Sequence, residues 1–284
     1  MFSVLKYFKE WFPVHGPNVA PPDSCNTQYP IILLHGIGFR DYMIISSWGH
    51  IPEFLRKGGA NVYLGELGAW NSSIENAGVL KQRIEGILTS TGAKKVNLIA
   101  HSKGGLDSRY MISKLGMGEK VASLTTISTP HWGSAFADVA TRLLPDDDWA
   151  YKAIDTLGKF MGDKDPESNI AIKELTRESM KKFNADVKDV EGVYYQSYGS
   201  RMLSPANDPI FLISYEIIKK YEGENDGMVS VDSCQWGNFR GILEGKGSGI
   251  SHLQITGAVS DVVSGINIPM WYAGIVQDLK AQGY

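Results

Sequence analysis

Three polar residues together have the types and order needed for nucleophilic chemistry, and the first of them is Ser102. It lies in the stretch AHSKGG, after a short run of strand-forming residues and before a helix-like pattern. A nucleophile at a strand-to-helix elbow adopts a strained backbone conformation, so the sites two residues before and after it must be small. Ala100 and Gly104 meet that requirement, although the usual first glycine is an alanine here. For this pattern taken alone, a serine in an ordinary turn is the alternative interpretation.

A serine hydroxyl is a weak nucleophile and needs a base, which in turn needs an orienting acid. In folds that present a serine in this way, the chain order is serine, acid, histidine. His131 precedes every candidate acid and is expected to hydrogen-bond locally, so His252, the one histidine after it, is the predicted base. Asp226, in the turn ENDGMVS, is the predicted acid because a carboxylate beside a glycine turn can project from a sheet edge. Four other acidic residues are rivals for that role: Asp208, Glu222, Glu224 and Asp232.

Acyl transfer also needs two backbone N–H groups directed at the oxyanion that forms during attack. The N–H of Lys103, the residue after the nucleophile, is one predicted donor. The other is the N–H of Ile37 in LLHGIG, where Gly36 and Gly38 allow the backbone to approach closely. An ordinary turn after a strand is the alternative interpretation of that stretch.

Apolar runs and amphipathic stretches alternate along the chain, which favours an α/β fold. The runs PIILLHG, NVYLGEL, VNLIA, VASLTTIS and VYYQSYGS are continuous, as is typical of strands buried on both faces of a parallel sheet. The stretches ENAGVLKQRIEGILTST, LDSRYMISKLG and IAIKELTRESMKKFNADV are the predicted helices. We therefore predict one domain over residues 1–284, with a mostly parallel central sheet and helices on both faces.

The interval 135–168 departs from this alternation. It holds two short amphipathic pieces, FADVATRLLP and WAYKAIDTLGKFMG, where the core fold needs only a short connection. We predict an inserted helical lid there, and a pair of ordinary surface helices is the alternative. Five apolar residues in or near it are predicted to line an acyl site, unless they are core residues: Phe39, Trp132, Phe136, Leu143 and Leu144.

The overall composition sets few further limits on function. The net charge of −3 gives no sign of a nucleic-acid partner, and no apolar run approaches the ~20 residues that span a bilayer. The start MFSVLKYFKEWFP is broken by charges and lacks the apolar stretch of a signal peptide. The compartment stays open: secreted if a leader was removed or bypassed, otherwise cytoplasmic. Cys25 and Cys234 are either bridged or two buried thiols.

Taken together, the motifs resemble those of the bacterial true lipases, the triacylglycerol lipase family of the α/β-hydrolase fold. LLHGIG, AHSKGG, STPHWGS, IKELTRESMKKFNAD, NDGMVS and SHLQ occur in that family's order and approximate spacing. The resemblance implies the same triad and oxyanion donors, and a lid over an acyl-chain pocket. It implies hydrolysis of carboxylic esters, above all acylglycerols at a lipid–water interface, with aliphatic polyesters as a side activity. A short-chain carboxylesterase, an acyltransferase or a thioesterase would use the same triad, and a non-enzymatic binding protein is the alternative of a different class.

The sequence mixes features of the Pseudomonas/Burkholderia and Gram-positive branches of that family. Ala100 and the stretch TTISTPH are similar to the Gram-positive branch, whose members often carry zinc held by histidines between the early strands and the elbow. Here no histidine lies between His50 and His101, so we expect no zinc.

Relatives in this family also hold a structural calcium ion near the catalytic histidine. Asp208 matches one of its ligands, but the second position, normally acidic, is the neutral Gln254. Because calcium prefers carboxylates, this departure weakens the case for the ion. No metal or other cofactor is assigned, and a structural calcium near Asp208 is the alternative. The disulfide of some relatives would use a cysteine near Cys234, and its usual partner is missing.

Overall fold

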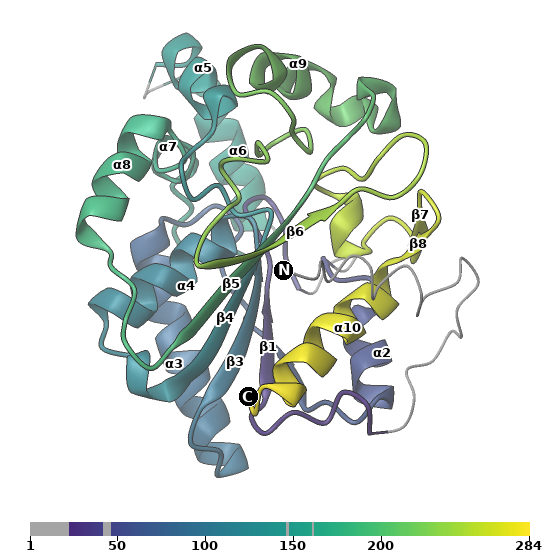
Figure 1. Cartoon of the computed structure of the whole chain (residues 1–284). Helices are drawn as coiled ribbons and strands as arrows, with labels where there is room; N and C mark the ends of the chain where they lie inside the picture. The colour runs from purple at the N-terminus through teal and green to yellow at the C-terminus, as the bar shows by residue number, and fades with distance from the viewer. Residues whose placement is uncertain (1–22, 42–46, 146–147, 161) are drawn as a thin grey trace.

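A six-stranded parallel sheet forms the centre of the protein (Figure 1). The computed structural model describes residues 23–41, 47–145, 148–160 and 162–284. The strand order is β2–β1–β3–β4–β5–β6, and each neighbouring pair is parallel. The strands are β1 Ile31–Leu34, β2 Val62–Leu64, β3 Val96–His101, β4 Val121–Ile127, β5 Tyr194–Ser200 and β6 Asn238–Leu243. The predicted α/β sheet is confirmed, and its five predicted strands are β1 to β5.

Helices cover both faces of the sheet, as predicted. The helices α3 (Ser73–Thr91) and α4 (Lys103–Lys114) lie on one face, and α2 (Ile51–Lys57) and α10 (Ile268–Ala281) lie on the other (Figure 1). In β1, Ile31 and Leu33 belong to the core cluster that includes α2 and α10, whereas Ile32 and Leu34 belong to the cluster that includes α3 and α4. Side chains alternate between the faces of a strand, so a strand buried on both faces has a continuous apolar sequence.

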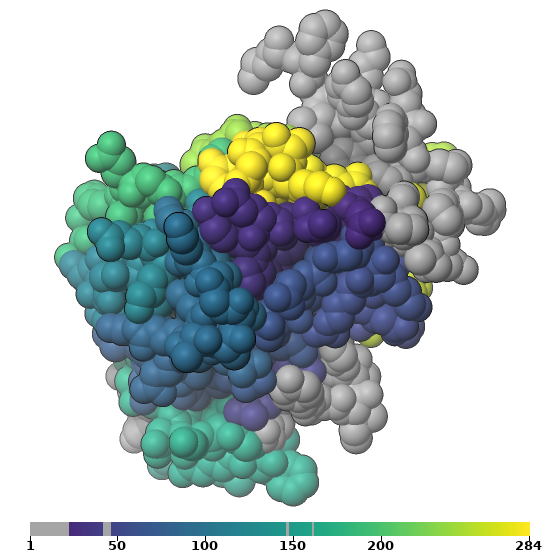
Figure 2. All heavy atoms as spheres, turned by 90° about the horizontal axis from the view of Figure 1, so that it is seen from below, coloured from purple at the N-terminus to yellow at the C-terminus, as the bar shows by residue number. Residues whose placement is uncertain are grey.

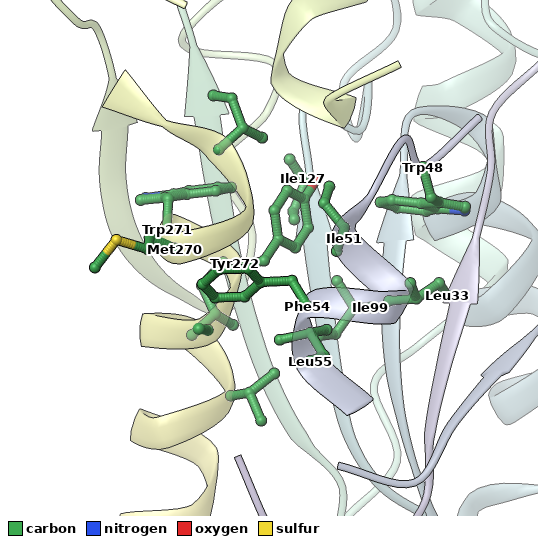
Figure 3. Close-up of a cluster of buried hydrophobic side chains, with 14 of the residues drawn as sticks. Leu33, Trp48, Ile51, Phe54, Leu55, Ile99, Ile127, Met270, Trp271 and Tyr272 are labelled. Carbon is green, nitrogen blue, oxygen red and sulfur yellow. The ribbon is translucent and has the colours of Figure 1, made fainter. Parts of the chain in front are cut away.

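The core under α10 is rich in aromatic residues. Figure 3 shows Trp271 and Tyr272 of α10 directed toward α2 and the strands, with Trp48 on the far side of the cluster. The rings of Trp48 and Tyr272 meet edge to face with centroids 5.8 Å apart, a favourable geometry for aromatic pairs. Figure 2 shows α10 beside the residues that lead into β1, where the Gln28 N–H donates to the Tyr284 carbonyl at 2.9 Å. The end of the chain is thus tied to the beginning of the sheet.

The remaining helices lie mostly beyond the carboxyl ends of the strands (Figure 1). They are α5 Ala135–Leu143, α6 Trp149–Phe160, α7 Ser168–Lys173, α8 Arg177–Asp186 and α9 Leu212–Tyr221. Short 3-10 turns and one small hairpin complete the described elements: Gly118–Lys120, Pro205–Asn207, Pro209–Phe211, Gln254–Thr256, β7 Val262–Val263 and β8 Ile266–Asn267. The predicted interval 135–168 does contain two short helices, α5 and α6, and its role as a lid stays a prediction.

One predicted helix is wrong in its extent. The stretch 170–187 was expected to be continuous, but it contains the end of α7 and then α8. Thr176 has an extended backbone, and its side chain accepts the Ser179 N–H at 3.3 Å, so it caps a new helix rather than continuing the old one. The amphipathic pattern runs through both helices and therefore hides the break.

Some sequence-based expectations concern the ends and the cysteines. Residues 1–22 lie outside the described residues, so the reading of the first residues and the single domain over 1–284 stay predictions. Among the described residues, no helix is long and apolar enough to cross a membrane. Cys25 and Cys234 are both buried and free, so the two-thiol alternative is the correct one.

Candidate active site

Ser102 lies at a strained elbow between β3 and α4. Its φ of 53° and ψ of −132° place a non-glycine residue in a conformation that L side chains rarely adopt. The Ser102 N–H donates to the Ile127 carbonyl at 2.9 Å, and the Ser102 carbonyl accepts the Thr129 hydroxyl at 2.7 Å. The end of β4 and the residues after it therefore hold the elbow, and the predicted strand–elbow–helix arrangement is confirmed.

Two glycines make room for this elbow. A Cβ on Gly36 would lie 2.5 Å from the Ser102 Cβ, and a Cβ on Gly104 would lie 2.5 Å from the His35 carbonyl oxygen. The nearest obstacle at Gly104 is therefore the backbone that follows β1, and not the side chain at Ala100 that the sequence suggested. Gly36 was predicted for close backbone approach, and its contact is with Ser102 itself.

The structure brings Ser102, His252 and Asp226 together in one hydrogen-bonded row. His252 Nε2 lies 2.9 Å from Ser102 Oγ, and His252 Nδ1 lies 2.9 Å from Asp226 Oδ2. An ionised carboxylate only accepts, so Nδ1–H donates to Asp226 and Nε2 is left to accept the serine proton. The side chains are nearly inaccessible, with residue exposures of 4%, 5% and 1% respectively. This arrangement can draw a proton from the hydroxyl as its oxygen attacks an electrophile.

The Asp226 carboxylate is fixed by its own turn. Its Oδ1 accepts the N–H groups of Met228 at 3.0 Å and Val229 at 2.8 Å, and its carbonyl accepts the His252 N–H at 2.8 Å.

The rival acids have other contacts: Glu222 accepts the first N–H of α5, Glu224 pairs with Arg201, Asp208 accepts the Ser251 hydroxyl, and Asp232 lines a surface pocket. Of the five acidic residues, Asp226 is the one whose carboxylate hydrogen-bonds the His252 ring in the described part of the chain.

Both predicted oxyanion donors are neighbours of the elbow. Lys103 is the first residue of α4, and Ile37 lies between Gly36, which contacts Ser102, and Gly38, which has a φ of 78°. The N-terminus of a helix carries partial positive charge, which favours an anion there. Their role as oxyanion donors stays a prediction.

The Lys103 side chain has contacts that the sequence reasoning missed. Its Nζ donates to Asp107 Oδ1 at 2.8 Å, and both side chains are 2% exposed. Asp107 Oδ2 accepts the side-chain amide of Asn76 at 2.9 Å. The lysine–aspartate spacing of four residues was the available signal, since it places both on one helix face.

A second histidine lies against His252. The rings of His101 and His252 have centroids 4.5 Å apart. Burial, and secondarily the nearby His252, lowers the pKa of His101 well below its ordinary value, which favours the neutral form of this ring. The sequence offered only one sign of it, which is that His101 directly precedes Ser102.

His131 belongs to a buried cluster beneath the elbow. Its Nδ1 accepts from Arg109 at 3.2 Å, and its Nε2 donates to Thr126 Oγ1 at 2.9 Å. The Arg109 guanidinium lies 3.5 Å from the centroid of the Trp236 ring, a cation–π contact. Burial, helped by Arg109, lowers the pKa of His131 well below its ordinary value, and burial lowers the pKa of Arg109 to about 10. The predicted local hydrogen bonding of His131 is confirmed.

The five predicted acyl-site residues do not share one environment. Phe39, Phe136 and Leu144 are half-buried, whereas Trp132 and Leu143 are 53% and 74% exposed. Trp132 lines a separate open pocket of about 690 Å³ with residues of α8, α9 and the turn at 230–233. The acyl site stays a prediction. The positions of these side chains favour Phe39, Phe136 and Leu144 over Trp132 as residues that would line it.

The residues around Asp208 do not fit a calcium ion. Asp208 Oδ2 accepts the Ser251 hydroxyl at 2.7 Å, and Gln254 Oε1 accepts the Ser251 N–H and the Asn207 amide, both at 3.0 Å. Calcium prefers six to eight oxygen ligands with several carboxylates, but these groups already satisfy one another. In the described part of the chain no cluster of three histidine, cysteine or acidic side chains is arranged to hold a metal.

Comparison with known proteins shows similarity to ester-cleaving hydrolases. The sequence model of the family described as palmitoyl protein thioesterase matches residues 30–207, which is more than half of the chain. A triacylglycerol lipase of Vibrio cholerae is 33% identical over 74% of this chain and 75% of its own length. A triacylglycerol lipase of Burkholderia plantarii is 40% identical over 45% of this chain and 37% of its own length.

Solved structures share the fold at lower identity. A metagenomic carboxyl esterase superposes with a TM-score of 0.73 and 16% identity over 94% of this chain and 78% of its own. The mature form of a Bacillus licheniformis lipase superposes with a TM-score of 0.65 and 21% identity over 93% of this chain and 99% of its own. The chain thus belongs to the family that the sequence model describes and, with its bacterial relatives, to the lipases of the α/β-hydrolase fold, which are ester-cleaving hydrolases.

Proposed function

We propose that the protein hydrolyses acylglycerols with Ser102 as nucleophile, His252 as base and Asp226 as orienting acid. The observation that carries this proposal is the pair of 2.9 Å hydrogen bonds that joins the three side chains. The names of the bacterial relatives support acylglycerols as the substrate class.

The first half-reaction acylates the serine. His252 Nε2 takes the hydroxyl proton while Ser102 Oγ attacks the ester carbonyl, and the Ile37 and Lys103 N–H groups stabilise the oxyanion. The resulting imidazolium gives its proton to the leaving alcohol. Asp226 keeps Nδ1–H directed away from the serine, so the lone pair of Nε2 faces the reacting proton.

The second half-reaction releases the acid. His252 deprotonates a water molecule, which attacks the acyl-enzyme carbonyl, and the same two N–H groups stabilise the second oxyanion. Collapse of this intermediate breaks the Ser102–acyl bond, and His252 returns the proton to the serine.

Substrate access is a further part of the proposal. Ser102 is only 4% exposed, so a triglyceride reaches it only if part of the surface moves. Large apolar side chains are exposed on α5, on α6 and near the start of α9: Leu143, Trp149, Leu157, Phe160, Ile210 and Ile213. An apolar surface of this kind is typical of a site that meets a lipid phase. We therefore infer that the 135–168 interval is a lid that moves at a lipid–water interface.

The test is the initial rate of tributyrin hydrolysis as its concentration is raised through the solubility limit. A jump in rate when droplets form supports a lipase with a working lid, whereas saturation below that limit supports a soluble-ester carboxylesterase. Ser102→Ala should lower kcat by at least about 10⁴-fold, by comparison with measured triads. Ser113→Ala, a serine in the same helix, is the matched control and should leave kcat unchanged. Full activity in a clean Ser102→Ala preparation refutes the proposed nucleophile.

A thioesterase is the second candidate, because the matching family model carries that description. The same triad would attack a thioester carbonyl and release a thiol in place of an alcohol. The kcat/KM ratio for a palmitoyl thioester against the matching oxygen ester separates the two. A ratio that strongly favours the thioester would replace the lipase proposal.

A further inference from the structure

The loop at residues 67–70, which follows β2, contains no predicted catalytic residue but is hydrogen-bonded on nearly every backbone group. His35 Nε2 lies 3.2 Å from the Leu67 carbonyl oxygen, and the Asn76 side chain bonds both backbone groups of Gly68, at 3.0 and 3.1 Å. The Ala69 carbonyl accepts the Gly38 N–H at 2.8 Å, and the Trp70 carbonyl accepts an N–H from residue 167 at 2.9 Å. The backbone of this loop is therefore a meeting point of segments that are far apart in the sequence.

Asp163, just after α6, supplies the carboxylate that completes this arrangement. Its Oδ1 accepts the Ala69 N–H at 3.0 Å and the Arg40 guanidinium at 2.5 and 3.2 Å, and its Oδ2 accepts the Trp70 N–H at 3.1 Å. The Asp163 side chain is 0% exposed. Four donors on one buried carboxylate satisfy the charge, and removing the carboxylate would leave all four without an acceptor.

The contacts lead directly to the predicted oxyanion loop at residues 36–40. Gly38 and Arg40 belong to that loop, and both are held through Asp163. Arg40 is held by the ion pair. Gly38 is held through the Ala69–Trp70 peptide unit, whose carbonyl accepts the Gly38 N–H and whose N–H donates to Asp163 Oδ2. Ile37 lies next to Gly38, and the glycines on either side of it leave the backbone little stiffness of its own. The Gly36 carbonyl, in the same peptide unit as the Ile37 N–H, lies 2.9 Å from His35 Nδ1. The outside anchors at Gly38 and Arg40 hold the other side of Ile37.

The second predicted donor is tied to the same loop. Asn76, which bonds Gly68, also donates to Asp107, and Asp107 pairs with the Lys103 side chain. The two segments that carry the predicted oxyanion donors are thus linked through one buried hydrogen-bond network.

We propose that Asp163 is a positioning residue for the oxyanion hole, which holds the 67–70 loop and Arg40 so that the Ile37 N–H faces the reacting carbonyl. This inference rests on the proposed function, because it assumes that Ile37 supplies an oxyanion donor. It also makes Asp163 an anchor point within the 135–168 interval.

The test is Asp163→Asn, which keeps the shape but removes the charge and presents an N–H₂ group to the donors. Asp165→Asn, an exposed carboxyl two residues away, is the matched control. We would measure kcat and KM on a soluble p-nitrophenyl ester, with active sites titrated so that only folded enzyme is counted. The readout specific to the oxyanion is the Ki of a trifluoromethyl ketone, which forms an anionic adduct with the serine.

Removing one oxyanion donor costs about 10²- to 10³-fold in kcat, and a displaced donor costs less. We expect Asp163→Asn to lower kcat by roughly 10- to 100-fold with KM within about twofold, and to raise the ketone Ki by the factor lost in kcat/KM. Asp165→Asn should match the wild type in all three. A folded Asp163→Asn enzyme with wild-type kcat, or with reduced kcat and an unchanged Ki, overturns the proposal.

If Asp163→Asn does not fold, Arg40→Gln decides the matter, because it keeps both backbone contacts of Asp163. A severalfold loss of kcat with a matching rise in Ki supports the proposal, and wild-type values for both overturn it. Failure of the proposed function would be visible separately, because the Ser102→Ala variant would then hydrolyse the ester as fast as the wild type.

Discussion

The contact between Gly36 and Ser102 gives a prediction whose size can be worked out from the structure. A Cβ on Gly36 would lie 2.5 Å from the Ser102 Cβ and 3.0 Å from its Oγ. Carbon atoms in contact normally lie about 3.5–4.0 Å apart, so Gly36→Ala requires a relative shift of roughly 1 Å. The elbow is held by β4 and the helix start, and Gly36 is held by the end of β1, so the shift must fall on the nucleophile or on the oxyanion loop.

A misplacement of about 1 Å in an active site costs on the order of 100-fold in rate, which is about 2.7 kcal/mol of barrier. We expect Gly36→Ala to lower kcat on a soluble p-nitrophenyl ester by about that factor. Labelling of Ser102 by a fluorophosphonate should slow in parallel, because it needs the same nucleophile geometry. KM should change much less, since the acyl chain binds elsewhere in the proposed site.

The control is Gly86→Ala in the middle of α3. A Cβ there meets nothing within 4 Å, so the substitution should stabilise the helix by up to about 1 kcal/mol and leave kcat unchanged. If Gly36→Ala keeps wild-type kcat at a wild-type Tm, then the close approach of Gly36 to the serine is wrong, and the placement of the oxyanion loop with it.

Two further outcomes are expected from the same geometry. Neither EDTA nor millimolar calcium should change the Tm, because the groups around Asp208 hydrogen-bond one another. A rise in Tm on adding calcium would contradict this expectation. Gln254→Ala should lower kcat, because it removes the side-chain oxygen that holds the turn around His252. Burial keeps the pKa of His131 well below its ordinary value, so below about pH 6.5 the unfolded chain binds a proton that the folded protein does not. Stability should therefore fall as the pH drops through this range, by at most about 1.4 kcal/mol per pH unit from this residue, and level off above about pH 7. Urea unfolding at pH 7.5 and about 5.5 should show a shallower pH dependence for His131→Asn, and an equal slope in both proteins would refute the assignment of a neutral His131.

The strands and the elbow were predictable because they leave local signals. Each of β1 to β5 is a continuous apolar run, and the strand–serine–helix pattern occupies adjacent residues. The strand β6 was not predicted, because it lies at the sheet edge, where only Leu243 is buried and no apolar run is needed. The break between α7 and α8 was missed for a different reason: it depends on the side-chain cap at Thr176, which does not interrupt the amphipathic pattern.

The sequence by itself determined which residue types are available for the chemistry and in what order they occur. With one histidine after His131, the choice of His252 needed no structure. Only the tertiary structure decided that His252 meets Ser102 across 150 residues, that Gly36 packs on the nucleophile, and that Asp163 holds the loop beside the predicted oxyanion donor. The physical reason is that hydrophobic periodicity and turn preference act over a few neighbouring residues. A hydrogen bond from a backbone N–H to a distant carboxylate depends on where the sheet brings the two segments, and the donor can be any residue but proline.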